Sequence, residues 1–382
     1  MRDAVIVEAV RTPVGKRNGA LSGLHPADLS AQVLRALVDR SGIDPARVDD
    51  VVWGCVNQVG EQTFDIGRTA VLSAGWPESV PATTVDRQCG SSQQAVSFAA
   101  AGVIAGHYDI VVAGGVESMS RIPLGSAQLA GMSPLGTEYA ARYGPDFPNQ
   151  GLGAEEIARR WKIDRQDADA FALLSHERAA RAADEGRFDA QIHPVAGPDG
   201  VVDRDEGIRR SGTLESLATL RSAFLEDGVL TAANSSQISD GAAALLLTTS
   251  ETAAELGLRP IARVHTSVVV GSEPTIMLTG PLPATHRALQ RSGIRLADIE
   301  VFEVNEAFAT VPLAWLSEFG VPPELVNPLG GAIALGHPLG GSGARIMTTM
   351  VHHMRDNGVR YGLQTMCEGG GQANATILEL VG

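Results

Sequence analysis

The feature of this sequence that most constrains its fold is an internal repeat. The stretch "SGIDPARVDDVVWGCVN", which ends at Asn57, resembles "SGIRLADIEVFEVN", which ends at Asn305. Further on, "CGSSQQAV" followed by "HYDIVVAGG" has the same outline as "HPLGGSGA" followed by "RYGLQTMCEGGG". Each is a loop, a glycine- and serine-rich helix start, an apolar helix and a strand that ends in glycines, and the offset is roughly 250 residues. The repeat predicts two similar α/β halves.

The chain between these repeated segments alternates strand-like and helical stretches, as βαβ units do. "DAVIVEAV" predicts a strand, "ADLSAQVLRALVDR" a helix with apolar residues at helical spacing, and "DDVVWGCV" the next strand. The segment of about 125–239 differs, because it is richer in arginine and mixes long helical patterns with polar irregular stretches. We expect it to be an excursion from the sheets, either a surface decoration or a lobe that covers substrate.

Composition excludes several classes of function. The net charge of −14 argues against nucleic acid as a partner, because phosphates attract a basic face. Three cysteines in 382 residues do not make a disulfide framework, so we expect a cytoplasmic protein. Apolar runs such as "GAAALLL" are too short to span a bilayer, and no membrane partner is expected. Without a CxxC, HExxH or Walker-type motif, the sequence gives little support to a metal site.

Two of the three cysteines stand where a reactive thiol is conceivable. Cys89 lies in "VDRQCGSS", at the head of a small-residue helix whose positive end stabilises a thiolate. The competing interpretation is a buried filler, since free cysteine is among the most buried residue types. Cys367 in "MCEGGG" precedes three glycines, which either bring backbone N–H groups to an anion or form a tight turn.

An imidazole and an amide stand on comparable loops. His337 lies in the glycine-lined stretch "GGAIALGHPLGGSG", and Asn305 ends the apolar strand of "VFEVN", where it is either a turn former or a hydrogen-bond donor to an oxyanion. If the two halves bring these loops together, one thiol is the nucleophile with the histidine as its base. The other thiol serves as general acid and base.

Read in order, these motifs resemble the thiolase family, the acetyl-CoA acetyltransferases and 3-ketoacyl-CoA thiolases. The resemblance covers essentially the whole chain and rests on "VEAVRTPVGKRNGAL", "CGSSQQA", "AGGVESMSRIP", "NSSQISDGAAA", "GPLPA", "VNEAFA", "GGAIALGHPLGGSGAR" and "MCEGGGQANA". It implies the five-layered αβαβα thiolase fold, with two duplicated halves and an inserted loop domain. We accordingly expect an N-terminal half at 1–119 completed by 240–260, a loop domain at 120–239, and a C-terminal half at 261–382.

The resemblance also implies a role for each matching residue. Cys89 corresponds to the acyl-accepting nucleophile, His337 to the residue that activates it, and Cys367 to the proton shuttle at the substrate's α-carbon. Asn305 matches the residue that holds a water beside the histidine as an oxyanion hole, and the backbone N–H groups of Cys89 and Gly369 form a second one. Substrate contacts are expected at Ser236 for the pantetheine, Arg209 near the CoA adenosine, and Met277 and Phe308 in the acyl pocket.

The implied activity is an acyltransferase reaction in which coenzyme A is a substrate and no cofactor is bound permanently. "GKRNGALSGLH" and "SSQISDGAAA" favour degradation of fatty acids or steroid side chains. The alternative is a biosynthetic enzyme that condenses two acetyl-CoA molecules. The segment "GEQTFDIGRTAV" matches a region of subunit contacts in the family, so a homodimer or homotetramer is expected.

The sequence departs from the family pattern in two places. Asp86 stands where an asparagine is usual, and "NQGLGAEEIA" replaces a stretch resembling "HMGxTAExxA", which leaves the CoA and acyl contacts at Asn149, Gln150 and Gly153 open. A condensing relative of ketoacyl-synthase type would carry a histidine or asparagine in place of Cys367. A non-catalytic CoA- or lipid-binding member would lack the nucleophile or the histidine.

Overall fold

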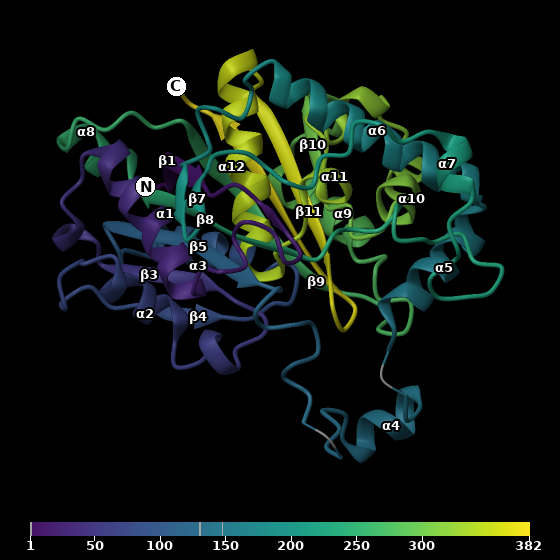
Figure 1. Ribbon diagram of the computed structural model, residues 1–382. Helices are drawn as coiled ribbons and strands as arrows, with labels where there is room; N and C mark the ends of the chain where they lie inside the picture. Colours follow the sequence, from purple (N-terminus) through teal and green to yellow (C-terminus); the bar gives the residue numbers. More distant parts are fainter. Residues whose placement is uncertain (1, 130, 147) are drawn as a thin grey trace.

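The computed structural model describes residues 2–129, 131–146 and 148–382. Its strands form two half-sheets that share a four-strand order, with β4 as an additional edge strand in the first (Figure 1). The N-terminal half-sheet runs β4-β3-β5-β8-β1, and the C-terminal one runs β10-β11-β12-β9. In both, the β3–β5 or β10–β11 pair is parallel and the next two pairs are antiparallel. The strands are β1 (Val5–Arg11), β3 (Asp50–Gly54), β4 (Thr83–Val85), β5 (Ile110–Ser118), β8 (Ser239–Thr248), β9 (Ala262–Gly271), β10 (Val301–Val304), β11 (Tyr361–Glu368) and β12 (Gln372–Leu380).

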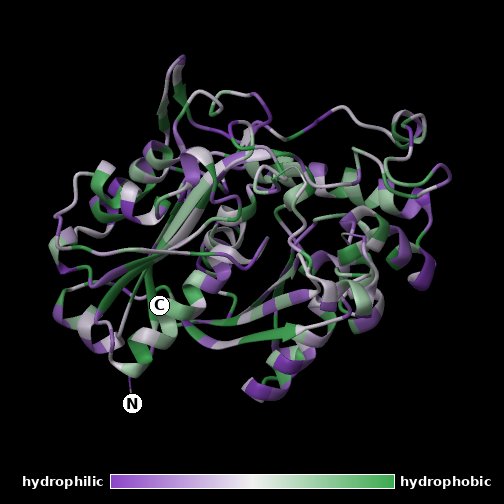
Figure 2. Ribbon diagram, turned by 90° about the horizontal axis from the view of Figure 1, so that it is seen from below, coloured by the Kyte–Doolittle hydropathy of each residue, from purple (hydrophilic) through white to green (hydrophobic). Residues whose placement is uncertain are grey.

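The half-sheets join edge to edge where β1 pairs with β9, through Val5↔Arg263 and Ile6↔Ala262, and the short β2 (Gly15–Lys16) pairs with β8. Strand β8, "SDGAAALLLT", is buried along its whole length because helices cover both of its faces. Apolar residues accordingly concentrate on the strands, as Figure 2 shows.

Helices on both sides of each half-sheet complete five layers. The first core lies between the N-terminal half-sheet and the outer helices α1 (Pro26–Ser41) and α2 (Ile66–Ser73). The second lies between the half-sheets and is filled by α3 (Ser91–Ala105) and α12 (Leu339–Asn357), and the third lies under α9 (Pro281–Ser292) and α10 (Thr310–Phe319). The short helices α8 (Ser250–Glu255) and α11 (Ala332–Leu335) lie in connections. The predicted αβαβα thiolase fold is confirmed.

The two central helices approach each other at glycines. A Cβ placed on Gly343 would lie 2.3 Å from the backbone nitrogen of Gln93, which no side chain tolerates. Across the same contact, the backbone N–H of Ala344 donates to Ser92 Oγ at 2.9 Å. The glycine- and serine-rich helix starts that revealed the repeat therefore let α3 and α12 cross at backbone distance, which brings the loops before them together.

A long excursion separates β5 from β8, where the second half has only the hairpin turn at Gly370 and Gly371, both with positive φ. Helix α5 packs against α10, α6 packs against α11, and the stretch with α4 projects from the body (Figure 1). We propose the division at 120–239 on this ground. Its elements are α4 (Thr137–Tyr143), α5 (Gln150–Trp161), α6 (Arg165–Asp184), β6 (Val195–Gly197), β7 (Gly200–Val202) and α7 (Leu214–Ala218). Across the described ranges, no helix is both long and apolar enough to cross a membrane.

Candidate active site

Cys89 lies in a tight turn immediately before α3. The preceding residue, Gln88, has φ +48°, a left-handed conformation that is costly for a residue with a side chain. Ser91 Oγ holds the turn by donating to the Gln88 carbonyl at 2.6 Å and accepting from the backbone N–H of Arg87 at 2.9 Å. The Cys89 side chain is only 5% exposed and packs with Met366 and Leu339, so the thiol is buried at the junction of the two halves.

His337 lies two residues before Leu339, between α11 and α12, and its hydrogen bonds define its tautomer. Its Nδ1 is 2.6 Å from Ser342 Oγ, and that hydroxyl donates its only hydrogen to the Pro338 carbonyl at 2.8 Å. Ser342 must therefore accept from Nδ1–H, which leaves the lone pair on Nε2. Nε2 has no hydrogen-bond partner within the described part of the chain. The sequence argument singled out His337 but missed Ser342, although it lies one helical turn into the same glycine-rich motif.

Cys367 and Asn305 meet on the C-terminal half-sheet. Cys367 is fully buried near the end of β11, and Asn305 follows β10, held by its backbone N–H to the Thr365 carbonyl at 3.1 Å. Burial raises the pKa of Cys367, and the Asn305 amide opposes only a small part of that rise. Neither the oxygen nor the nitrogen of that amide has a hydrogen-bond partner within bonding geometry among the described residues. A buried amide without a partner is available to a ligand or a water.

The pKa values of the two thiols and the imidazole are set by burial more than by the nearby helix N-terminus. Burial, followed by the nearby carboxylate of Glu368, raises the pKa of Cys89 to about 12. Burial also raises the pKa of Cys367, and the neighbouring Cys89 adds to that rise. Burial and then Arg345 lower the pKa of His337 to about 3. Desolvation thus outweighs the stabilisation that a helix N-terminus can give to a thiolate. These directions leave both thiols and the imidazole uncharged in the resting site.

Glu117, at the end of β5, joins the loops of the two halves and was not singled out from the sequence. Its two oxygens accept five hydrogen bonds, which come from Val56 N (2.9 Å), Asn57 N (3.0 Å), Asn57 Nδ2 (3.3 Å), Gln62 Nε2 (2.8 Å) and Gly340 N (2.9 Å). The Gly340 donor belongs to the first turn of α12, directly after the His337 loop. The carboxylate therefore fixes that loop relative to the N-terminal half-sheet.

The two residues expected along the acyl pocket lie beside Cys367. Met277, Phe308 and Cys367 belong to one buried cluster. Met277 has φ +60°, another strained backbone position, and Phe308 stacks edge-on with Phe224 at 5.7 Å between ring centroids. Phe224 was missed from the sequence because it lies in an irregular stretch of the excursion with no periodic pattern. The structure thus places an apolar wall against the second thiol.

Of the remaining predicted site residues, Ser236 and Gly369 lie beside the loops of the site, and Arg209 lies apart from them. Ser236 is half-buried, and its backbone N–H donates to the Ala307 carbonyl at 2.9 Å, which places it beside the Asn305 loop. Gly369 packs against Gln88, since a Cβ there would lie 2.8 Å from Gln88 Oε1. Arg209 is exposed on the excursion, and its backbone N–H donates to His176 Nδ1 at 3.1 Å. The structure gives Arg209 no contact with the thiols.

The unusual start of α5 has structural roles. Asn149 caps the helix by accepting from the backbone N–H groups of Gly151 and Leu152 at 2.9 and 3.2 Å. A Cβ on Gly153 would lie 2.6 Å from the Ile276 carbonyl, so this glycine lets α5 approach the strained Met277 segment. The CoA and acyl contacts of this stretch stay open.

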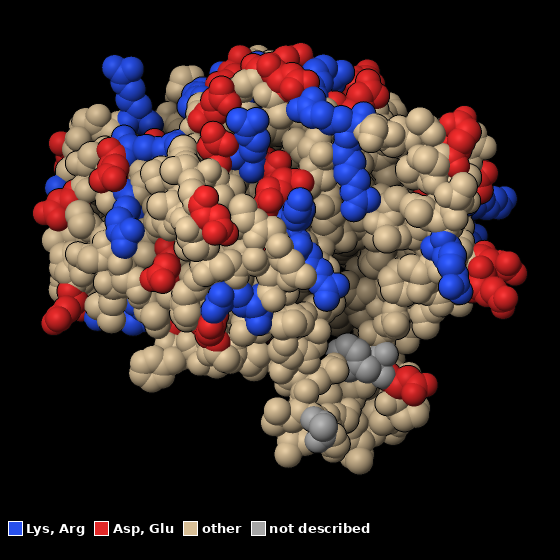
Figure 3. All heavy atoms as spheres, viewed as in Figure 1, with Lys and Arg blue, Asp and Glu red and all other residues tan. Residues whose placement is uncertain are grey.

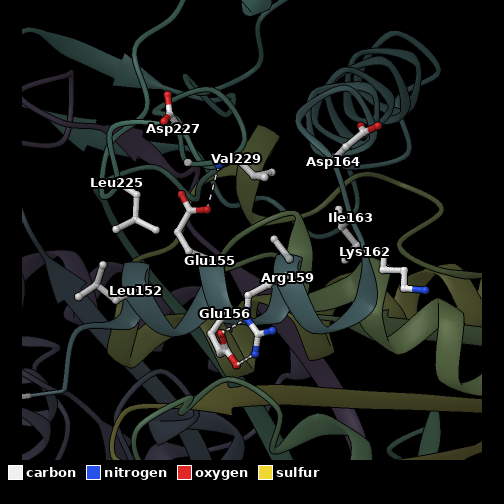
Figure 4. Close-up of a pocket in the computed structure, with 12 residues that line it drawn as sticks. Leu152, Glu155, Glu156, Arg159, Lys162, Ile163, Asp164, Leu225, Asp227 and Val229 are labelled. Atoms are coloured by element: carbon white, nitrogen blue, oxygen red, sulfur yellow. Dashed lines mark hydrogen bonds and ion pairs between the residues drawn. The ribbon is translucent and has the colours of Figure 1, made fainter.

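A surface cavity of about 520 Å³ lies between α5 and the segment at 225–229 (Figure 4). Its walls come from α5 and from the segment that follows Leu225, where Glu155 accepts from the Val229 backbone at 2.9 Å. None of the predicted catalytic residues lines it, so we do not assign the chemistry to this cavity. Figure 3 shows a separate hollow between the sheet body and the lobe that carries α5, with Lys and Arg side chains along its edge. The described residues hold no cluster of three or more His, Cys, Asp or Glu side chains that could bind a metal ion.

Comparisons with known proteins agree with this geometry. Residues 4–251 match the family described as "Thiolase, N-terminal domain", and residues 258–380 match "Thiolase, C-terminal domain". The chain is 50% identical to a steroid 3-ketoacyl-CoA thiolase of Mycobacterium tuberculosis, over 99% of this chain and 94% of that protein. It is 45% identical to a 3-ketoacyl-CoA thiolase of Aliivibrio fischeri, over 99% and 100%.

A crystal structure gives the same result for the fold. The acetyl-CoA acetyltransferase of Bacillus anthracis superposes with a TM-score of 0.92 at 37% identity, covering 100% of this chain and 99% of that one. Both domain matches, the full-length relatives and the shared fold lead to one conclusion: the chain belongs to the thiolase family.

Proposed function

We propose that the protein is an acetyl-CoA C-acyltransferase that cleaves 3-ketoacyl-CoA with CoA into acetyl-CoA and a shortened acyl-CoA. The observation that carries this proposal is the free Nε2 lone pair of His337, held in the required tautomer by Ser342, in a site with two buried neutral thiols. A base with this tautomer and a thiol that cannot ionise alone fit a nucleophile activated at the moment of attack.

In the first half-reaction, His337 Nε2 takes the Cys89 proton and the thiolate attacks the 3-keto carbon. The Cα–Cβ bond then breaks, the acyl group stays on Cys89 as a thioester, and Cys367 protonates the acetyl-CoA enolate. Asn305, whose amide is unpartnered within the described chain, is our candidate for the oxyanion hole, with the backbone N–H groups of Cys89 and Gly369 as the second.

In the second half-reaction, the Cys367 thiolate takes the proton of CoA. The CoA thiolate attacks the thioester, and the Cys89 sulfur leaves and recovers its proton from His337. Both residues then hold the protons with which they began, so the cycle balances. The raised pKa of Cys367 suits this step, because it makes the thiolate a strong base toward the CoA thiol.

Substrate contacts are proposed from the resemblance to the family. Met277 and Phe308 would line the acyl group, Ser236 would meet the pantetheine, and Arg209 would lie near the adenosine end of CoA. The relatives named above for steroid and other 3-ketoacyl-CoA substrates favour degradation of fatty acids or steroid side chains. Condensation of two acetyl-CoA molecules is the second candidate, supported by the acetyltransferase with the same fold.

Thiolysis assays decide between these functions. Loss of the magnesium–enolate absorbance is followed with acetoacetyl-CoA, longer 3-ketoacyl-CoAs and steroid 3-ketoacyl-CoAs, for the wild type and Cys89→Ala. We expect cleavage of long-chain or steroid substrates and none by Cys89→Ala. Cleavage of acetoacetyl-CoA alone would favour the biosynthetic candidate. Robust thiolysis by Cys89→Ala would refute the mechanism, and no turnover of any substrate would favour a non-catalytic CoA- or lipid-binding member of the family.

We further propose that the protein works in the cytoplasm as a homodimer or homotetramer. Phe64 is 94% exposed in the segment expected to make subunit contacts, and β4 is an edge strand of the N-terminal half-sheet. Exposed aromatic side chains and open strand edges are typical of surfaces that another chain covers. Light scattering after size-exclusion chromatography measures the assembly, and a monomer at micromolar concentration would contradict this proposal.

A further inference from the structure

Glu368 is a buried carboxyl group beside the site that the mechanism above does not use. It ends β11 directly after Cys367, and side chains alternate along a strand, so it lies on the opposite face from that thiol. That face also carries Met366, which packs with Cys89. Glu368 is fully buried, and neither carboxyl oxygen has a hydrogen-bond partner in the described part of the chain. A buried carboxyl without a partner is costly and calls for an explanation.

Glu368 lies directly against the backbone that follows the nucleophile. A Cβ on Gly90 would lie 1.9 Å from Glu368 Oε1 and 2.8 Å from Asn374 Nδ2. The same Asn374 amide donates to the Gly90 carbonyl at 3.2 Å, and its oxygen has no partner among the described residues. Two side chains of the C-terminal half-sheet, Glu368 and Asn374, thus pack against the Cys89–Gly90 turn.

The charged groups that face Glu368 come from the loop before α3. Burial raises the pKa of Glu368 to about 8, Arg87 opposes that rise, and Asp86 adds to it. Arg87 donates through Nη1 to Gln372 Oε1 at 2.9 Å, while its buried Nε has no partner within the described ranges. Among the charged groups that raise the pKa of Cys89, Glu368 has the largest effect, followed by Glu117 and Asp86.

We propose that Glu368 is a positioning residue for the nucleophile: with Asn374 it supports the Cys89–Gly90 turn, and the charge on its carboxyl group controls how readily Cys89 loses its proton. While the carboxyl is neutral, it supports the turn without opposing the thiolate. Once it ionises, it opposes the thiolate and slows every reaction that needs one. This inference rests on the proposed function only in taking Cys89 as the nucleophile.

The test uses alkylation, which needs no substrate. The rate of iodoacetamide labelling at Cys89 is measured by peptide mass spectrometry from about pH 6.5 to about pH 9.5, for the wild type and Glu368→Gln. We expect equal rates at the acidic end, where both side chains are neutral, and labelling of the variant roughly 10-fold faster at the alkaline end. A rate ratio that is the same at every pH, including a ratio of one, would overturn the role of the charge.

Two controls separate the outcomes. Glu8→Gln makes the same change at a carboxyl on β1 whose pKa burial also raises, and it should leave the Cys89 profile unchanged. Failure of the proposed function would show as thiolysis by Cys89→Ala and would leave the alkylation profiles as they are. The two failures are therefore distinguishable.

A steric experiment tests the support role without reference to pH. Gly90→Ala should abolish acylation of Cys89 by an acyl-CoA donor, since its methyl group would collide with Glu368. Glu368→Ala in the same chain removes two of the three atoms that the methyl group meets and leaves only the Asn374 amide. We expect the double variant to recover at least 10-fold in acylation rate over Gly90→Ala, as read by intact-protein mass spectrometry. No recovery in a folded double variant would overturn the contact.

Discussion

Replacing Ser342 by alanine tests whether the tautomer of His337 is what makes this site work. In the resting enzyme, Ser342 Oγ accepts from Nδ1 at 2.6 Å and so leaves the Nε2 lone pair free. When Nε2 takes the proton of Cys89, the imidazole becomes charged, and the Nδ1–H···Oγ bond becomes charge-assisted. Such a bond contributes roughly 1.5–3 kcal/mol, against roughly 0.5–1.5 kcal/mol for the neutral bond of the resting enzyme. Because only this increase of about 1–1.5 kcal/mol occurs in the transition state, the variant should lose about 5- to 13-fold in kcat/KM.

The assay measures kcat/KM for thiolysis and, separately, the rate at which Cys89 is acylated in a single turnover. The matched control is Ser30→Ala, because Ser30 is also buried and donates to the carbonyl four residues earlier, Pro26, at 2.8 Å. It has the same helical back-bond as Ser342 but no imidazole partner. Ser30→Ala therefore reports the loss of a buried hydroxyl alone. If Ser342→Ala keeps kcat/KM within twofold of the wild type, or loses no more than Ser30→Ala, the tautomer argument is refuted.

Three further predictions concern stability. Glu117→Gln turns an NH₂ group toward backbone N–H donors, so the free energy of unfolding in urea should fall by about 2–4 kcal/mol. An unchanged value would contradict the role of the Glu117 carboxylate in joining the loops of the two halves. Gly343→Ala collides with Gln93 at 2.3 Å and should lower the free energy of unfolding by at least about 3 kcal/mol, whereas Gly271→Ala, with open space around it, should cost under about 1 kcal/mol. Burial lowers the pKa of His352 to about 4, below its unfolded value of about 6.5. Between these two pH values the unfolded chain binds more protons than the folded one, so the free energy of unfolding falls as the pH drops from about 6.5 to about 4. His352→Gln should reduce that loss between about pH 6.5 and about pH 4, and an unchanged acid slope in urea titrations would contradict the assignment.

The topology was predictable because the repeat is encoded in local patterns. The segments ending at Asn57 and Asn305 each form a helix end, a 3₁₀ turn and a strand in the structure. Gly42 and Gly293 cap the two preceding helices at φ 71° and 72°. Glycine caps, apolar periodicity and glycine-rich helix starts are all short-range signals, so the sequence suffices to recognise them.

The candidate site was only partly predictable. Cys89, His337, Cys367 and Asn305 stand in motifs that a reader can find, and their catalytic roles remain predictions. Glu117 and Phe224 escaped notice because their importance lies in contacts with residues distant in the chain or in an irregular segment. Ser342 was also missed, although it lies only five residues after His337 in the same glycine-rich motif. The rise that burial causes in the pKa of Cys89 could not be read from the sequence, since a helix N-terminus is visible there and the depth of burial is not.

The stretch "VDRQCGSS" by itself determined that a thiol stands before a helix rich in small residues, and the repeat determined that a second, similar half exists. Only the tertiary structure decided what surrounds that thiol: the Glu368 carboxyl against Gly90, and the buried side chains of Met366 and Leu339. The physical reason is that periodicity along a chain reports which faces are buried, whereas protonation depends on the distances and the dielectric around each group. In this protein, those are set by residues more than 220 positions apart in the sequence.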